Sequence, residues 1–535
     1  MTVIRILVQQ ARRDRVNLPV WVIGTVALLA VAAASVGQEY GDAAGRGEIL
    51  RVALATPALL ALRGIPNGVS LGSAVHFQSF AFLGVTIGLM NIFLATRHGR
   101  ADEEKGRREL VLAGPVSRLA PPIATLLLGV VANAVFVVLA ICGYAATGVP
   151  VSGAVVSSVA LGMIGLAFLG LAMLAGELTE TSRGANTIGV ILVLGAYALR
   201  AAGDALGRPD VTRVTLQPAW PSWLSPIGWG QQTLAFTDDR WWPIGLIAAL
   251  AAVALAAALL IHTRRELGAG LLPERSGRAT ARAALGSPVG LAWRLQWPTL
   301  TAWAGGSALL GLVLGSLVTA VSNANIGNAQ IQSILQSLGH TGASDMGRTL
   351  ISAVMVLVGA TAAAAGVQAV LRMREEETEG RLEPVLAAPR SRIMWLLSYA
   401  LIAAASVLIV LVATGVAASI GFAAVGQPDN AWLALGSALV QAPAALSFVG
   451  VTALLVGLLP RPAVSLGWAV FGILIGFGLF GGLLNLPKGV DKISPIANVP
   501  ALPTDDWVPT IILALIAVIA TALGAMALRR RDLST

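Results

Sequence analysis

The chain has very little charge and almost no cysteine. Only 12% of its 535 residues are Asp, Glu, Lys or Arg, whereas soluble domains carry about 25%. Cys142 is the single cysteine, which excludes an internal disulfide and a cysteine metal cluster. The four histidines, His76, His98, His262 and His340, lack the spacing of metal ligands. The sequence therefore predicts no metal site.

Lysine is also scarce, and this bears on nucleotide binding. The only lysines are Lys105, Lys488 and Lys492. A phosphate-binding P-loop needs a lysine that follows glycine and precedes serine or threonine. None of the three has these neighbours, and no nucleophile–base pair stands out. We therefore expect no enzyme activity, no catalytic residues and no cofactor bound by this chain itself.

Apolar residues dominate what remains. They make up 56% of the chain, with a mean hydropathy of +0.79. Several uncharged stretches exceed the length of about 20 residues that a membrane-spanning helix needs. The run at 19–37 is long enough to be a retained first helix and not a signal peptide. We predict an all-α polytopic membrane protein with about twelve spans, at 19–37, 74–96, 121–146, 153–176, 184–203, 243–262, 299–320, 348–371, 394–420, 431–459, 463–484 and 507–528.

The positive charge indicates the orientation. The formal net charge of +9 comes almost entirely from arginine. Arginines gather at the N-terminus, after the second expected span, after the sixth and at the C-terminus. The positive-inside rule places these regions, and both termini, in the cytoplasm, and it accounts for the basic balance without nucleic acid. The segments 38–73, 204–242, 321–347 and 485–506 are then expected to be outer loops.

A charged segment occurs twice. The first charged segment, Arg100–Arg118, and the second, Arg374–Arg392, match at eleven of nineteen positions. Shorter echoes, "SPI", "TDD" and "RR-x-L", follow at similar offsets. We predict two pseudo-symmetric six-helix halves, 1–265 and 291–535, joined by a cytoplasmic linker at 266–290. An even number of spans per half makes them parallel repeats.

Each charged segment has the pattern of a short cytoplasmic helix. Glu103 stands four residues before Arg107, as Glu377 does before Arg381, so each pair is expected to meet on one helix face. A solvated loop that only satisfies the positive-inside rule is the alternative, but that rule asks for no acidic residues. We therefore expect both segments to dock a pseudo-symmetric partner, through Asp102, Glu103, Gly106, Arg107, Glu109, Pro115, Glu376, Glu377, Gly380, Arg381, Glu383 and Pro389.

The N-terminal stretch before the first span is amphipathic. Val3, Ile4, Leu7 and Val8 recur at helical spacing, opposite arginines. This pattern predicts a helix that lies flat in the inner membrane interface. An ordinary charged flank that anchors the first span is the alternative.

These motifs together resemble permease subunits of type-2 ABC exporters, most closely the long duplicated permeases of tetronasin-type antibiotic exporters. The resemblance rests on E-x-x-G-R-x-E followed by V-L-A-x-P-x-S-R in both halves, on "LSPIGWGQQ" and on "RRELGAGLLP". It implies that the charged segments are coupling helices contacting two copies of a separate cytoplasmic ABC ATPase, which carry the ATP and Mg²⁺. It also implies a bacterial plasma membrane location, and outer loops at 204–242 and 485–506 that fold partly back toward the membrane. The second loop keeps "SPI" but loses the continuation "GWGQQ", so we do not expect equal roles for the two loops.

The cargo is expected to be apolar or amphipathic. Ionisable residues are nearly absent from the span centres, where ion-driven carriers keep acids or histidines. The resemblance places the pathway between the two halves. The alternative for the aromatic residues is that they pack within the protein or face lipid. The alternative for asparagine is a hydrogen bond between helices, which is more common than contact with a ligand. The substrate-path candidates are Phe77, Phe80, Phe82, Asn91, Trp468, Phe471 and Phe477.

The sequence thus predicts the membrane subunit of an ATP-driven exporter of hydrophobic compounds, such as antibiotics and drugs, working by alternating access. Two alternatives stay open. One is a secondary carrier driven by an ion gradient. The other is a non-transporting membrane scaffold that recruits a cytoplasmic partner through the charged segments.

Overall fold

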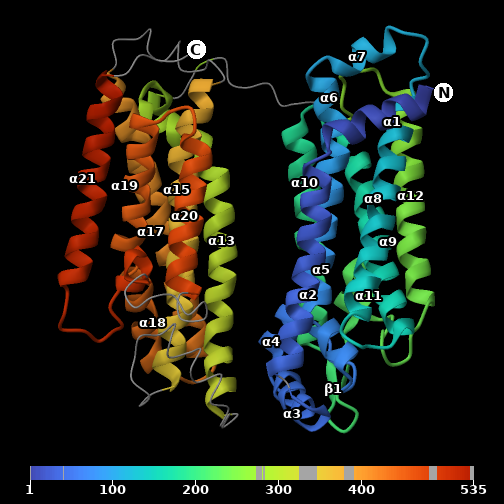
Figure 1. Ribbon diagram of the computed structural model, residues 1–535, viewed down its shortest axis with the longest axis horizontal. Coiled ribbons are helices and arrows are strands. Elements are labelled where there is room, and N and C mark those ends of the chain that lie inside the picture. Colours follow the sequence, from blue (N-terminus) through green and yellow to red (C-terminus); the bar gives the residue numbers. More distant parts are fainter. Residues whose placement is uncertain are drawn as a thin grey trace. The chain divides into compact units, whose positions relative to one another are not determined.

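The computed structural model describes residues 2–39, 41–272, 280, 283–323, 346–378, 391–480 and 491–530. The chain divides into two compact units, residues 1–277 and 278–535. Each is a bundle of long helices (Figure 1). In the described ranges, eleven helical segments are long and apolar enough to cross a membrane. The expected all-α polytopic membrane fold is confirmed.

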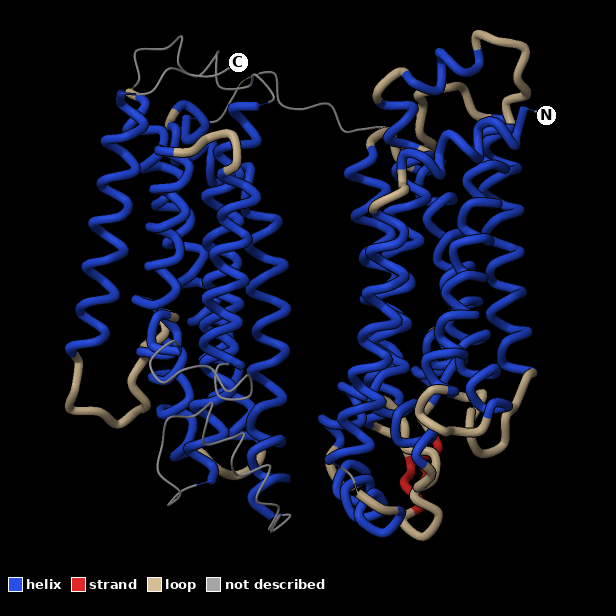
Figure 2. Tube along the Cα trace, viewed as in Figure 1, coloured by secondary structure: helices blue, strands red, loops and turns tan. Residues whose placement is uncertain are grey.

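The first unit has six long helices and several short elements. A tube view shows that helix makes up nearly all of it, with two short strands at one end (Figure 2). The elements are α1 (Thr2–Arg13), α2 (Asn17–Glu39), α3 (Ala43–Leu54), α4 (Pro57–Arg63), α5 (Leu71–His98), α6 (Arg100–Glu104), α7 (Arg107–Leu112), α8 (Ala120–Ala145), α9 (Val151–Leu178), α10 (Ser182–Ala205), β1 (Arg208–Asp210), β2 (Thr215–Gln217), the 3₁₀ helix η1 (Trp220–Leu224), α11 (Pro226–Gln231) and α12 (Trp242–Arg264).

The second unit differs from expectation in two spans. The stretch predicted at 431–459 is two helices, divided at Val440 and Gln441. Within the described residues, the helix at the predicted eleventh span is not among the eleven candidate membrane spans. The elements are η2 (Ala283–Gly286), α13 (Pro288–Asn323), α15 (Met346–Thr378), α17 (Arg392–Ala424), α18 (Asp429–Leu439), α19 (Ala442–Leu458), α20 (Ala463–Phe480), η3 (Asp491–Ile493), η4 (Pro495–Asn498) and α21 (Val508–Arg530).

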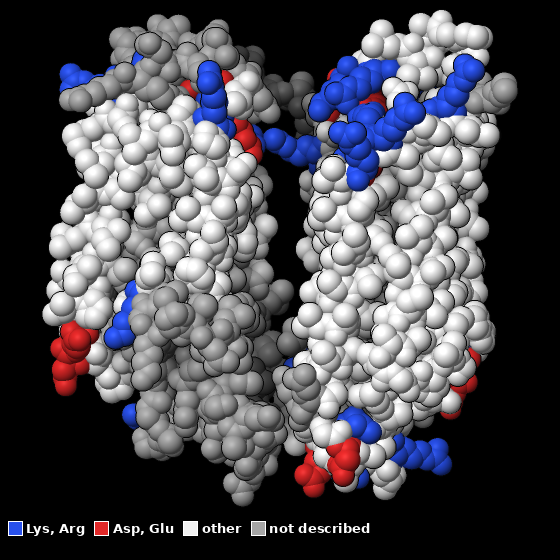
Figure 3. Space-filling model, viewed as in Figure 1, with Lys and Arg blue, Asp and Glu red and all other residues white. Residues whose placement is uncertain are grey.

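The outer surface of the helices is apolar. Val31 and Val253, on α2 and α12, are 68% and 67% exposed. Figure 3 shows charged side chains at the ends of the described helices and an uncharged band between them. A water-soluble bundle would cover such a surface with charge, whereas a bilayer solvates it.

The segment 38–73 is not the simple loop that its mixed composition predicts. It contains α3 and α4. The Asp42 side chain accepts a 2.9 Å hydrogen bond from the Gly45 amide and caps α3, and Pro57 occupies the first turn of α4. Both are standard helix-start signals.

The segment 204–242 folds back onto the helix ends of the first unit. Its hairpin β1–β2 is antiparallel, with Pro209 opposite Leu216. The short helix α11 follows and packs against α5, α9, α10 and α12. Its membrane depth stays a prediction.

Candidate functional site

The first charged segment forms a corner and not one continuous helix. α6 ends before Gly106, whose φ of +66° lies in the left-handed region, and α7 begins after it. The expected i,i+4 pair between Glu103 and Arg107 is therefore wrong. Arg107 Nη1 lies 3.4 Å from Asp102 Oδ1 instead, and Glu103 turns inward.

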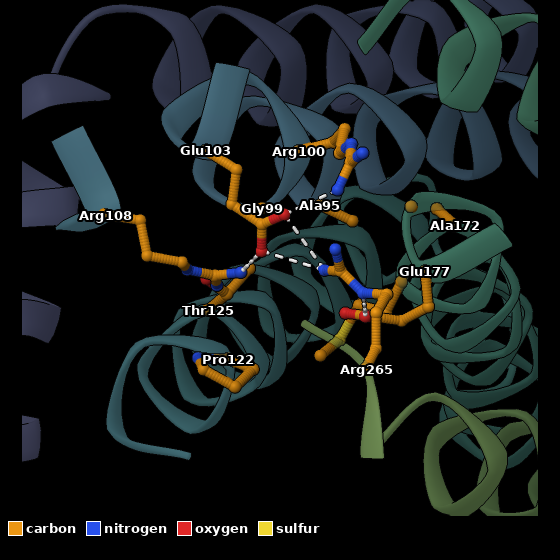
Figure 4. Close-up of a pocket in the computed structure, with 12 residues that line it drawn as sticks. Ala95, Gly99, Arg100, Glu103, Arg108, Pro122, Thr125, Ala172, Glu177 and Arg265 are labelled. Carbon is orange, nitrogen blue, oxygen red and sulfur yellow. Dashed lines mark hydrogen bonds and ion pairs between the residues drawn. The ribbon is translucent and has the colours of Figure 1, made fainter. Parts of the chain in front are cut away.

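Glu103 is buried among three arginines. Its Oε2 lies 2.6 Å from Arg100 Nη1, and Arg265 Nη2 lies 2.9 Å from both carboxylate oxygens. Arg108 forms a further ion pair with Oε1. In Figure 4 the carboxylate lies between Arg108 on one side and Arg100 and Arg265 on the other. A buried carboxylate persists only with such partners, so this cluster depends on all four side chains.

The cluster continues to the ends of α9 and α12. Arg265 Nε donates to Glu177 Oε2 at 2.6 Å, and His262 Nδ1 lies 2.9 Å from Glu177 Oε1. Burial lowers the pKa of the Arg265 guanidinium, but Glu177 and Glu103 outweigh it and raise the pKa above its ordinary value. Arg265 thus stays charged and connects α6, α9 and the chain after α12.

The N-terminal helix is tied to the same segment. Arg13 Nη1 and Nη2 lie 2.7 and 3.0 Å from the two oxygens of Asp102, and this hydrogen bond raises the pKa of Arg13. Asp14 is buried, which raises the pKa of its carboxyl, but His98 at 2.6 Å and Arg97 outweigh burial and hold that pKa below its ordinary value. The turn between α1 and α2 is therefore fixed to the end of α5.

The outward side of the corner carries mixed chemistry. Lys105, Arg107, Glu109 and Pro115 are exposed, and Leu110 is 79% exposed. Exposed charges of both signs therefore surround an exposed leucine, on a base that buried ion pairs hold in place.

Only the start of the second charged segment is described. Glu376 and Glu377 are buried at the end of α15, where Arg374 Nη1 lies 2.9 Å from Glu377 Oε2 and Arg372 Nη2 lies 3.1 Å from Glu376 Oε1. The other expected docking residues, Gly380, Arg381, Glu383 and Pro389, lie outside the described residues.

The path candidates of the first unit lie in different surroundings. Phe77 and Phe80 are 2% and 0% exposed, within the core of the unit, whereas Phe82 is 41% exposed. Asn91 is buried and exchanges two hydrogen bonds with Asn133 of α8, at 3.1 and 2.8 Å. In this structure the Asn91 amide therefore forms hydrogen bonds between α5 and α8.

The substrate-path candidates of the second unit lie on α20. Trp468 is 40% exposed, and its ring meets that of Phe471 edge to face at 5.7 Å. Phe471 also packs against Phe448 of α19, and Phe477 is partly exposed. A role of these seven residues in transport stays a prediction.

Sequence reasoning missed Glu177 and the roles of His262 and Arg265. One signal was available, an acid at the end of an otherwise apolar span. The spacing of His262 and Arg265, three residues apart at the end of another span, was a second. Arg200 and Asp204 were missed as well: they form a fully buried ion pair of 3.0 Å on α10.

Comparison with known proteins places the chain in a family. Residues 285–529 match the family described as the C-terminal domain of multidrug efflux system permease Rv1217c. The multidrug efflux system permease protein Rv1217c of Mycobacterium tuberculosis is 36% identical over 526 residues, which cover 97% of this chain and 93% of that protein. The chain belongs to the family of multidrug efflux system permeases.

Proposed function

We propose that this chain is the membrane-spanning permease of an ATP-driven exporter of hydrophobic compounds, and that separate cytoplasmic ATPase subunits dock on its charged segments. The relative's name, a permease of a multidrug efflux system, supports drug export and further subunits. The absence of a P-loop lysine from the sequence is in line with an ATPase on another chain.

The corner between α6 and α7 carries the docking proposal. A buried ion pair connects α6 to the chain just after α12 through Glu103 and Arg265, and a more exposed pair connects α6 to α1 through Asp102 and Arg13. A push on such a corner moves these helices together, because the pairs resist separate displacement. This is the property that alternating access requires of a coupling element.

The geometry separates contact residues from positioning residues. Glu103 is buried, so its replacement would disturb the corner itself, whereas Leu110 and Glu109 face outward. The sharper docking test therefore changes Leu110→Asp and Glu109→Arg together. Leu127→Ala, at a leucine of α8 that is 39% exposed, is the control.

The first measurement is co-purification of the tagged permease with the proposed ATPase subunits. The second is ATP-driven uptake of a hydrophobic dye into inverted vesicles. We expect the double variant to lose most of both at unchanged thermal stability, and Leu127→Ala to keep both. Full co-purification and dye uptake by the double variant would contradict docking at this corner.

The two charged segments need not be equivalent. Helix pairs α9–α12 and α19–α21 both pack through a glycine: a Cβ on Gly170 would lie 3.1 Å from the Ala251 carbonyl oxygen, and one on Gly450 would lie 2.5 Å from that of Ala517. The proposed duplication implies that Gly170 corresponds to Gly450 and Ala251 to Ala517. The two helix pairs can then be aligned on these contacts.

That alignment puts Gly457 at the position of Glu177 and Leu528 at the position of His262. The second unit then lacks the acid–histidine pair that extends the cluster of the first. We therefore propose that the acid–histidine pair of Glu177 and His262 supports the corner of the first unit alone.

One observation favours the rival ion-driven carrier. His76 on α5 and Arg200 and Asp204 on α10 are buried in helices long enough to cross a membrane, where ionisable groups often serve ion coupling. Dye transport in liposomes by the permease alone, driven by a proton gradient without ATPase, would establish that reading. Transport that requires ATPase and ATP excludes it.

A further inference from the structure

A phenylalanine of the 232–240 loop fills a slot between two helices of the first unit. The ring of Phe236 lies over Gly72 on the first turn of α5 and Gly153 on the first turn of α9. A Cβ on either glycine would lie 2.6 Å from Phe236 Cγ, too close for any real contact. The slot therefore exists only because both positions are glycine. It lies at the end of this unit opposite α6 and α7 (Figure 1).

Aromatic rings line the slot. The Tyr144 ring centroid lies 5.2 Å from that of Phe236, and the His76 centroid lies 6.4 Å away in an edge-on arrangement. The ring centroid of Phe80 lies 4.3 Å from that of His76. These separations are typical of favourable aromatic pairs, each adding about 0.5–1.5 kcal/mol beyond burial. The slot is thus suited to a flat aromatic ring.

The His76 ring next to the slot also has a nitrogen without a hydrogen-bond partner among the described residues. His76 is buried, and its Nδ1 lies 3.0 Å from Ser157 Oγ, which in turn lies 3.1 Å from Tyr144 Oη. Its Nε2 has no hydrogen-bond partner among the described residues. A buried ring nitrogen without a partner is costly, and a polar atom of a bound molecule would satisfy it.

The loop that carries Phe236 is strained. Leu234, Phe236 and Asp239 have φ values of +45°, +70° and +47°, a region that residues other than glycine rarely adopt. Local contacts hold this conformation: Asp239 Oδ1 accepts from the Phe236 amide at 2.8 Å, and Asn67 Nδ2 donates to the Ala235 carbonyl at 3.3 Å. Such strain persists where the surroundings enforce it and lowers the free energy needed to leave that conformation.

We propose that Phe236 is an internal occupant of a ring-binding site, and that an aromatic ring of a hydrophobic cargo takes its place when the 232–240 loop moves away. The site comprises Gly72, His76, Tyr144 and Gly153. This inference rests on the proposed export of hydrophobic compounds. It is tested by binding to the permease alone, so a failure of ATP coupling or of ATPase docking leaves it intact.

The first test measures binding to the full chain in nanodiscs by equilibrium dialysis. The probe is tetraphenylphosphonium, and tetrabutylphosphonium is its matched non-aromatic control. Phe236→Ala removes the internal competitor, so the apparent affinity for tetraphenylphosphonium should rise about tenfold if the site is free about a tenth of the time in the native chain. Adding Gly72→Leu to Phe236→Ala refills the slot and should reverse this gain, because the atoms nearest a Cβ on Gly72 all belong to the Phe236 side chain.

A matched variant excludes a trivial cavity effect. Phe136 on α8 is also a fully buried phenylalanine of the same core. Phe136→Ala should leave the affinity for tetraphenylphosphonium unchanged. An equal gain in Phe136→Ala and Phe236→Ala, or no gain in Phe236→Ala, would overturn the proposal.

The second test keeps Phe236 and so does not depend on the folding of Phe236→Ala. Because Cys142 is the only cysteine, Cys142→Ser gives a cysteine-free chain, into which Ala235→Cys places one thiol at a fully buried position. Tetraphenylphosphonium should accelerate modification of that thiol by a membrane-impermeant maleimide severalfold, and tetrabutylphosphonium should not. An unchanged rate at saturating tetraphenylphosphonium would show that Phe236 is a fixed anchor.

Discussion

Arg265 reaches from the chain just after α12 and places its Nη2 2.9 Å from both carboxylate oxygens of Glu103 on α6. The two residues are 162 positions apart in the chain. Both side chains are buried, with 4% and 2% exposure. This pair joins the charged corner to the last span of the first unit, and the first two predictions below follow from it.

Replacing Glu103 with glutamine should destabilise the first unit. The change keeps the shape of the side chain but leaves Arg100 and Arg108 buried without this carboxylate and Arg265 with Glu177 alone. We expect a loss of about 3–5 kcal/mol, as for a broken buried pair. Thermal unfolding in detergent measures it. Glu109→Gln, at an exposed position, is the control and should change stability by less than about 0.5 kcal/mol. Equal unfolding temperatures for Glu103→Gln and the native chain would contradict this account.

Replacing Arg265 with lysine should also destabilise the unit, although the charge is kept. A lysine ammonium cannot reach Glu177 and Glu103 in the way that Nε and Nη2 of one planar guanidinium do. The effect of Arg265→Lys should be smaller in a Glu103→Gln background, because one of its two partners is already lost. Strictly additive unfolding free energies would show that the two residues act independently.

Stability should depend on pH through Asp14. Because the folded-state pKa of Asp14 lies below its ordinary value, its contribution is present above about pH 4 and is lost as the pH falls through the folded-state pKa. Asp14→Asn should therefore cost about 1.5–3 kcal/mol near pH 7, the value of hydrogen bonds to a charged group. The difference from the native chain should shrink as the pH falls below about 4. A difference that is constant from pH 7 to pH 3 would contradict the assigned ion pairs.

The amide pair on α5 and α8 should show energetic coupling. Asn91→Leu alone leaves the Asn133 amide without its partner in an apolar core, and the reverse holds for Asn133→Leu. The double variant removes both amides and should lose about 1 kcal/mol less stability than the sum of the singles. Unfolding of the four proteins in detergent gives this cycle. Zero coupling would mean that each amide finds another partner when the other is removed.

Parts of the site were readable from sequence, and parts were not. The repeated segment located the corner, because charge is rare in this chain and a charged segment that occurs twice stands out. The pairing of Glu103 with Arg107 was wrong, because Gly106 in the left-handed region ends α6 and resets the helical spacing. Glu177 and His262 were missed because their meeting depends on the packing of α9 against α12, which no local pattern encodes.

The sequence by itself determined that this protein lies in a bilayer and that its long apolar runs are helices. Long uncharged runs require a bilayer, and in a bilayer the backbone must satisfy its own hydrogen bonds, so the runs are helices. Only the tertiary structure decided which charged side chains are buried and with whom, and that Phe236 lies between Gly72 and Gly153. Those facts depend on the distances between helices remote in sequence, where burial makes each ion pair, amide pair or glycine contact specific.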